Sequence, residues 1–222
     1  MLSSAEENYI KAIFKISDKK GIPVSTNSIA DELETTAASV TDMIQKLSDK
    51  NLVFYEKYKG VSLSSDGKTQ ATRLLRKHRL WECFLVDKLG FLWDEVHNIA
   101  EQLEHVQSDK LIDRLAEFLD HPKFDPHGDP IPDSGGRFTL RQQTKLSELS
   151  PGHSCLVVGV SEHSSTYLQY LADIGIQIGA SINILDMYPY DGALKIKIEN
   201  EAPQIISKQV AQNMIVKESR NE

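Results

Sequence analysis

Four potential metal ligands lie close together in the middle of the chain. They are His97, Glu101, Glu104 and His105. If this stretch is helical, offsets of 0, +4, +7 and +8 place all four side chains on one stripe of the helix. Two imidazoles and two carboxylates suit a divalent transition metal, although His and Glu are also common on a solvated helix face. A second pair at helical spacing, His78 and Glu82, lies upstream and favours the metal interpretation.

The composition is that of an ordinary globular protein. The 222 residues are 40% hydrophobic and 26% charged, which suits one large domain or two small ones. No apolar run approaches the roughly 18 residues of a membrane-spanning helix, and no signal peptide opens the chain, so we expect a cytoplasmic protein with no membrane partner. Cys83 and Cys155 form no CxxC pair and suit a reducing compartment. The net charge of −7 argues against a general nucleic-acid binder, so any DNA contact must come from a local patch.

The first 72 residues predict a winged helix-turn-helix. A helix over 7–17 is followed by a polar turn, a short helix over 28–33, and a longer helix that begins after Thr35-Thr36. Strands are expected over 52–55 and 61–64, joined by a turn. In such a unit the second helix of the motif enters the major groove by its N-terminal residues, and the hairpin contacts the DNA backbone.

This arrangement assigns a set of candidate DNA contacts. Small residues and hydroxyls at the start of the second helix can approach bases and phosphates closely. Lysines further along that helix and at the hairpin tip can contact phosphates. The candidates are Thr26, Asn27, Thr36, Ala37, Ala38, Ser39, Thr41, Asp42, Lys46, Lys57 and Lys59. Residues 1–72 hold 9 basic against 10 acidic side chains, so a module that docks protein is an alternative.

The next part of the chain predicts helices and then an extended segment. A long helix should begin near Ser65-Asp66-Gly67 and reach about Leu89, a second should span 93–107, and a third should span 111–119. The apolar stripe of the third, together with Trp81, Leu85 and Val86, is expected to support dimerisation. Residues 121–138 are rich in Pro and Gly and predict a linker or extended arm.

After residue 143 the pattern changes to short strands. The clearest span 155–160, 182–185 and 194–198, with one helix over 167–174 and an Asp-Gly hairpin turn within 188–192. A β-barrel of about 75 residues fits this pattern. The predicted fold is therefore mainly α with a small all-β domain. Its parts are a winged helix-turn-helix over 1–72, a helical metal-binding and dimerisation domain with a Pro-rich linker over 73–142, and an SH3-like domain over 143–222.

Several short strings add a resemblance that spacing alone does not provide. They are Arg76-Lys-His-Arg-Leu80 followed by Glu82, Val96-His97, Glu104-His-Val106 with Ser108-Asp109, and Asp125-Pro-His-Gly-Asp-Pro-Ile-Pro132. With the winged-helix pattern, they resemble the diphtheria toxin repressor family of bacterial metal-dependent transcriptional repressors. The resemblance spans roughly residues 5–133. Residues 143–218 resemble, less closely, the family's SH3-like, FeoA-like C-terminal domain.

The resemblance implies a primary metal site formed by Asn8, Glu101, Glu104 and His105. Position 101 is cysteine in iron-type members and glutamate in manganese-type members, and the harder carboxylate favours Mn²⁺. Asn8 departs from the Met or Asp of the family but still offers an amide oxygen. Lys11 stands where some manganese-type members have a glutamate for a second metal, which argues against their close two-metal arrangement.

The resemblance also implies an ancillary site formed by His78, Glu82 and His97. In some manganese-type members the linker adds ligands from a Cys-Pro-His-Gly motif, whose matching residues here are Asp125 and His127. A polar turn of the linker is the alternative reading of that pair. Iron-type members also take ligands from the C-terminal domain, and Glu162 and His163 fall near that stretch.

These features predict a metal-dependent transcriptional repressor. When loaded with a divalent metal, most plausibly Mn²⁺, a homodimer would bind an inverted-repeat operator in double-stranded DNA. An Fe²⁺-responsive repressor of the same family is the alternative. A metalloenzyme is disfavoured because His-Glu-x-x-His, a nucleophile motif and a Gly-rich phosphate loop are all lacking in the sequence. A metal-binding interaction or transport-accessory module would leave the winged helix unexplained.

Overall fold

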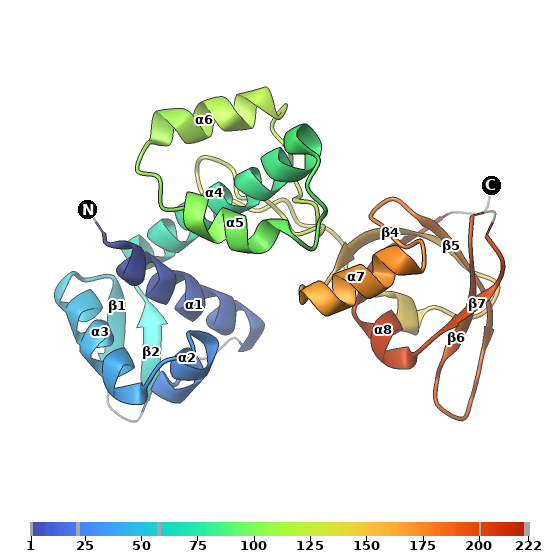
Figure 1. Ribbon diagram of the computed structural model, residues 1–222. Helices are drawn as coiled ribbons and strands as arrows, with labels where there is room; N and C mark the ends of the chain where they lie inside the picture. Colours follow the sequence, from blue (N-terminus) through green and yellow to red (C-terminus); the bar gives the residue numbers. More distant parts are fainter. Residues whose placement is uncertain (1, 21–22, 57–58, 200, 220–222) are drawn as a thin grey trace.

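Three structural units follow one another along the chain in the computed structural model (Figure 1), and each has a hydrophobic core. The structure describes residues 2–20, 23–56, 59–199 and 201–219. The first core includes Ile13 and Ile44, the second includes Leu80 and Ile112, and the third includes Leu171 and Ile182. The predicted class, helical units followed by a small β domain, is confirmed.

The first core belongs to a winged helix-turn-helix. It comprises α1 (Ser4–Lys20), α2 (Thr26–Glu32), α3 (Ala37–Asp49) and an antiparallel hairpin of β1 (Val53–Glu56) and β2 (Gly60–Leu63). Ser25 and Thr36 act as N-caps, because their hydroxyls accept hydrogen bonds from the amides of Ser28 and Ser39. The caps explain why α2 starts two residues earlier than the apolar pattern alone suggests.

The helical unit comprises α4 (Ser65–Leu89), α5 (Val96–Leu103) and α6 (Asp109–Phe118), and the second core lies between α4, α6 and Ile131 of the segment that follows. The N-cap Ser64 begins α4, and Gly90, with a left-handed φ of 72°, ends it. In Figure 1, α1 lies alongside the N-terminal part of α4, so the first helix of the DNA-binding unit also packs against the helical unit. The predicted boundary between residues 72 and 73 remains a prediction and falls within α4, a continuous helix.

One expected helix is shorter than predicted. The stretch 93–107 is helical only over Val96–Leu103, Glu104 is the C-cap, and His105 lies in the turn that follows. The reason is the start of α6, where the Ser108 hydroxyl accepts from the amide of Leu111 and the chain must first change direction. The prediction that all four ligands share one helical stripe is therefore wrong for His105.

The Pro-rich segment 121–138, hereafter the arm, packs against α4. It forms a single antiparallel bridge, Phe124 to Pro130, within itself. Arg76 Nη1 donates to the carbonyl of Pro132 at 2.8 Å, and Arg79 Nη2 lies 3.0 Å from Asp129 Oδ2. These contacts fix its extended backbone against the helical unit.

The third core is formed by a six-stranded antiparallel sheet in the order β3-β8-β4-β5-β6-β7. Its elements are β3 (Thr144–Lys145), a 3₁₀ turn η1 (Leu146–Glu148), β4 (Ser154–Val160), α7 (Ser165–Asp173), β5 (Ser181–Met187), β6 (Leu194–Ile198), β7 (Gln204–Ile206), α8 (Lys208–Gln212) and β8 (Met214–Glu218).

The three strands and the helix that the sequence predicts for this domain are present. The short elements β3, β7, β8 and α8 were not predicted. The end strands β3 and β7 pair with β8 and β6 but not with each other among the described residues, so the sheet is not closed into a barrel there. No helix in the described ranges is both long and apolar enough to cross a bilayer.

Candidate metal centre and DNA-binding surface

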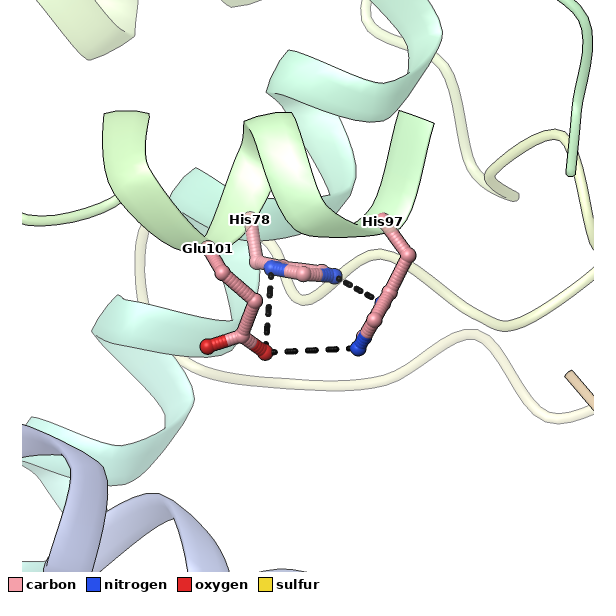
Figure 2. Close-up of side chains that lie close together, drawn as sticks. All are labelled: His78, His97 and Glu101. Atoms are coloured by element: carbon pink, nitrogen blue, oxygen red, sulfur yellow. Dashed lines mark hydrogen bonds and ion pairs between the residues drawn. The ribbon is translucent and has the colours of Figure 1, made fainter. Parts of the chain in front are cut away.

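The metal-ligand candidates gather where α4 and α5 face each other. Figure 2 shows His78 of α4 beside His97 and Glu101 of α5. His97 Nε2 lies 3.5 Å from Glu101 Oε1, His78 Nδ1 lies 3.9 Å from the same oxygen, and His78 Nε2 lies 3.2 Å from His97 Nδ1. Ligand atoms of these three residues all fall within 4.8 Å of one another, which is close enough to share one ion.

Glu104 forms the buried floor of this cluster. Its side chain is fully buried, Oε2 lies 2.6 Å from His78 Nδ1, and Oε1 accepts from Lys11 Nζ at 2.5 Å. The same ammonium donates to Glu101 Oε1 at 2.7 Å. A lysine of α1 therefore neutralises the two carboxylates that sequence reasoning assigned to the primary site.

Asn8 and His105 approach the same carboxylates from two sides. Asn8 lines a cavity of about 320 Å³ together with Lys11 and Glu101, and its Oδ1 is buried without a hydrogen-bond partner among the described residues. His105 Nε2 is 4.0 Å from Glu104 Oε1, and its Nδ1 is 2.6 Å from Glu7 Oε2. The Asn8 oxygen is an unsatisfied hydrogen-bond acceptor whose lone pairs a cation could bind.

Glu7 is a residue that sequence reasoning missed. Its Oε2 lies 2.6 Å from His105 Nδ1, and its Oε1 accepts a hydrogen bond from Gln107 Nε2 at 2.9 Å. A carboxylate on one imidazole nitrogen orients the ring and leaves the other nitrogen to bind a metal. The sequence offered one signal for Glu7, which is its position next to Asn8 in a helix that faces the candidate ligands.

A second cluster joins α4 to the arm. It contains Glu82, Asp125 and His127, all buried, with ligand atoms within 4.8 Å of one another. His127 Nδ1 lies 3.7 Å from Glu82 Oε2, and its Nε2 donates to the carbonyl of Trp93 at 2.8 Å. Asp125 Oδ1 accepts from the amide of His127 at 2.9 Å. His127 lies in a turn of the arm, and both side chains are buried, Asp125 with 7% and His127 with 2% of its surface exposed. Their role as metal ligands remains a prediction.

Glu82 stands between the two clusters. Its Oε1 lies 3.0 Å from His78 Nε2 and 3.4 Å from His97 Nδ1, while Oε2 faces His127. Burial alone would raise the pKa of Glu82, but hydrogen bonds from His127, His78 and His97 outweigh it and hold the pKa well below its usual value. The carboxylate is therefore ionised and ready to bind a cation.

The two candidate ligands of the arm have shifted pKa values. Burial, with the charges of Glu82 and Asp129, raises the pKa of Asp125 to about 7. Burial opposes the charged form of His127, but its bond to Glu82 prevails and raises its pKa to about 9. A metal that bound here would therefore displace protons.

The C-terminal domain brings one further imidazole to this cluster. The ring of His163 lies 5.1 Å from the ring of His127, centre to centre, and its Nε2 lies 3.3 Å from the carbonyl of Val160. Glu162 does not join the cluster, because its side chain accepts from the amide of Ser164 at 3.0 Å. Of the two residues noted in the sequence, only His163 is near a metal-ligand candidate.

Most of the DNA-contact candidates in the winged unit are exposed. Thr26 is half-buried, and the other described candidates are exposed. The Thr41 hydroxyl donates to the carbonyl of Ala37, and Lys59 pairs with Glu56 at 2.6 Å, so both have local partners. Lys57 lies outside the described residues. The exposed set is Asn27, Thr36, Ala37, Ala38, Ser39, Thr41, Asp42, Lys46 and Lys59.

Comparison with known proteins agrees with this architecture. Residues 1–61 match the iron-dependent repressor N-terminal DNA-binding domain, 64–133 the iron-dependent repressor metal-binding and dimerisation domain, and 144–218 the FeoA domain. A solved manganese-dependent transcriptional repressor in complex with manganese is 32% identical, covers 96% of this chain and all of its own, and superposes with a TM-score of 0.84. The chain belongs to the diphtheria toxin repressor family.

Curated relatives in this family are named for iron and for diphtheria toxin. The diphtheria toxin repressor of Corynebacterium jeikeium is 33% identical over 131 residues, which are 59% of this chain and 54% of that protein. The iron-dependent repressor IdeR of Mycobacterium leprae is 32% identical over 131 residues, 59% of this chain and 56% of its own. The matched region thus spans about half of each of these two relatives. These relatives of the family are repressors rather than enzymes.

Proposed function

We propose that this diphtheria toxin repressor family member is a metal-dependent transcriptional repressor. The observation that carries the proposal is that candidate ligands come from α1, α4, α5 and the arm, while α1 is also part of the DNA-binding unit. A metal that bound these ligands together would favour one position of the DNA-binding unit relative to the helical unit. Metal and DNA affinity would then be linked, typically by about 1–3 kcal/mol.

The donor set supports two metal positions. The primary site would use Glu101, Glu104, His105 and Asn8, whose unpartnered Oδ1 fits a hard cation. The second would use His78, Glu82 and His97 of the helices with Asp125 and His127 of the arm, and Glu82 links the two groups because it faces both His78 and His127. A bound ion would supply positive charge between carboxylates that otherwise repel each other.

The chemistry of the donors favours Mn²⁺ over Fe²⁺. The primary set is rich in oxygen and lacks a thiolate, because position 101 is glutamate. A structural relative named as a complex with manganese supports this choice, whereas a curated relative named as iron-dependent supports Fe²⁺ as the second candidate.

A homodimer on an inverted-repeat operator is part of the proposal. Residues 64–133 match a domain described as metal-binding and dimerising. Phe118, on α6, exposes 63% of its surface and Leu111 exposes 42%, so α6 presents an apolar face that a second copy could cover. Two winged units related by a twofold axis would read two half-sites of opposite direction. Such a regulator would act in the cytoplasm.

One titration tests the proposal. Metal-loaded protein first selects binding sites from a pool of random DNA duplexes, and the selected duplex is then titrated with protein plus Mn²⁺, Fe²⁺ under anaerobic conditions, Co²⁺, Zn²⁺ or chelator. We expect metal to tighten specific binding about tenfold or more, within the range of typical coupling. Equal affinity with metal and with chelator would refute metal dependence. A selection that enriched no inverted repeat would refute the operator.

A further inference from the structure

Lys11 occupies the position that a metal would need. Its side chain is 5% exposed, and its ammonium bridges Glu101 Oε1 at 2.7 Å and Glu104 Oε1 at 2.5 Å. A divalent ion held by those two oxygens would lie close to the ammonium nitrogen if Lys11 stayed in place. Like charges at that distance in a buried site repel strongly, so the two cations cannot share the carboxylates.

A cavity beside Lys11 gives its ammonium an alternative position. The 320 Å³ cavity beside Lys11 is also lined by Glu32 and Glu34 at the end of α2 and by Lys15 of α1. Both carboxylates are exposed, and neither forms an ion pair among the described residues. A lysine side chain has four rotatable bonds, so a rotamer change can carry the charge from one pair of carboxylates toward the other.

We propose that Lys11 is a built-in competitor of the regulatory metal. In the metal-free protein its ammonium neutralises Glu101 and Glu104, and metal binding displaces it into the adjacent cavity. Lys11 would therefore raise the metal concentration at which the protein responds. The inference rests on the proposed function, because it assumes that Glu101 and Glu104 bind metal.

The displacement would also carry a charge toward the DNA-reading element. Glu32 is the last residue of α2 and Glu34 lies in the turn before α3. An ammonium placed between them would contact the turn that joins the two helices of the helix-turn-helix. Lys11 thus sets the metal concentration at which the protein responds, and its displaced ammonium would contact the turn that precedes α3.

Chemical labelling of the unaltered protein tests the displacement. The full chain is treated with a limiting amount of an acetylating ester, with Mn²⁺ or with chelator, and acetylation at Lys11 is measured by peptide mass spectrometry. We expect acetylation of Lys11 to rise about fivefold or more with Mn²⁺, because the amine leaves a buried ion pair for an open cavity. Exposed Lys217, in the C-terminal domain, is the internal control and should not change. Unchanged or lower acetylation of Lys11 in Mn²⁺-bound protein would overturn the inference.

A charge-removing variant tests the competition. Lys11→Met keeps a long side chain, and it should bind Mn²⁺ on the order of tenfold more tightly, because the ion no longer has to break two charge-assisted hydrogen bonds. Lys15→Met is the matched control. Lys15 lies one turn along α1 beside the same cavity and forms no ion pair among the described residues, so its variant should change affinity much less. If Lys11→Met is unfolded without metal, Lys11→Gln, which can still donate a hydrogen bond, replaces it.

Direct Mn²⁺ binding, followed by the spectroscopic signal of the free ion, separates the possible failures. If the unaltered chain binds no Mn²⁺, the proposed function and this inference both fail. If it binds Mn²⁺ and Lys11→Met binds no more tightly, or Lys15→Met gains as much, only the inference fails.

Discussion

Replacement of the buried Glu104 should weaken both the metal-free fold and the metal response. Glu104→Gln keeps the size of the side chain but removes its charge. In the structure that charge accepts from Lys11 Nζ at 2.5 Å and lies 2.6 Å from His78 Nδ1, with no exposure to water. Removing one partner of a buried ion pair costs about 3–5 kcal/mol. The amide oxygen of Gln retains part of the bonding, so we expect the free energy of unfolding to fall by about 2–3 kcal/mol.

Glu101→Gln is the matched control, because the same ammonium contacts both carboxylates. The side chain of Glu101 is 30% exposed, so solvent screens its charge and the loss should be about 1 kcal/mol or less. Both variants should lose metal-dependent DNA binding, since each would remove a ligand of the proposed primary site. Burial should therefore separate their effects on stability but not their effects on regulation.

The assay is urea unfolding in chelator, followed by the fluorescence of Trp81 in a Trp93→Phe background. Trp81 packs against the helical core, so it reports the unit that contains Glu104. A loss for Glu101→Gln equal to or greater than that for Glu104→Gln would refute the argument from burial. A Glu104→Gln protein that still responds at the same Mn²⁺ concentration would refute the ligand assignment.

Three further predictions concern selectivity, protons and the arm. Glu101→Cys should move the metal ranking toward Fe²⁺ and Co²⁺, since a thiolate is softer than a carboxylate, and an unchanged ranking in DNA titrations would contradict this. A metal at the second cluster needs Asp125 ionised and His127 neutral, and the pKa values of these groups are raised to about 7 and about 9. Between pH 7 and pH 9 metal binding must therefore displace one proton, so calorimetry should show metal affinity that rises about tenfold per pH unit. A pH-independent affinity would argue against these ligands. Gly128 has a φ of 87°, and a Cβ at this position would lie 2.2 Å from the carbonyl oxygen of Val158 in β4. Gly128→Ala should therefore release the arm from β4 and lower the metal-dependent protection of the arm in hydrogen exchange. Protection equal to that of the unaltered chain would show that this contact does not hold the arm.

Local sequence determined most of the helical framework. The N-caps Ser25, Thr36, Ser64 and Ser108 and the terminator Gly90 act within one helical turn, so the order of helices could be predicted without tertiary information. The hairpin of the wing followed from alternation and turn residues in the same way. The candidate ligands were likewise named by residue type, short spacing and family resemblance.

The sequence was less able to define short elements and ends. The strands β3 and β7 have two and three residues, so their pairing depends on neighbours distant in the chain rather than on a periodic pattern. The turn that removes His105 from α5 depends on where α6 begins. Each of these outcomes is decided by competition between neighbouring elements.

By itself, the sequence determined that this chain has a winged unit, a helical unit with His and Glu at metal-binding spacing, and a small β domain. Only the tertiary structure decided how the ligands are grouped. It put Lys11 between Glu101 and Glu104, and it made Glu82 face both His78 and His127. Lys11 is 93 residues from Glu104, and Asp125 and His127 are more than 40 residues from Glu82. Contacts over such separations arise when helices and the arm pack, because burial forces charged side chains to find partners, and no local pattern specifies which ones.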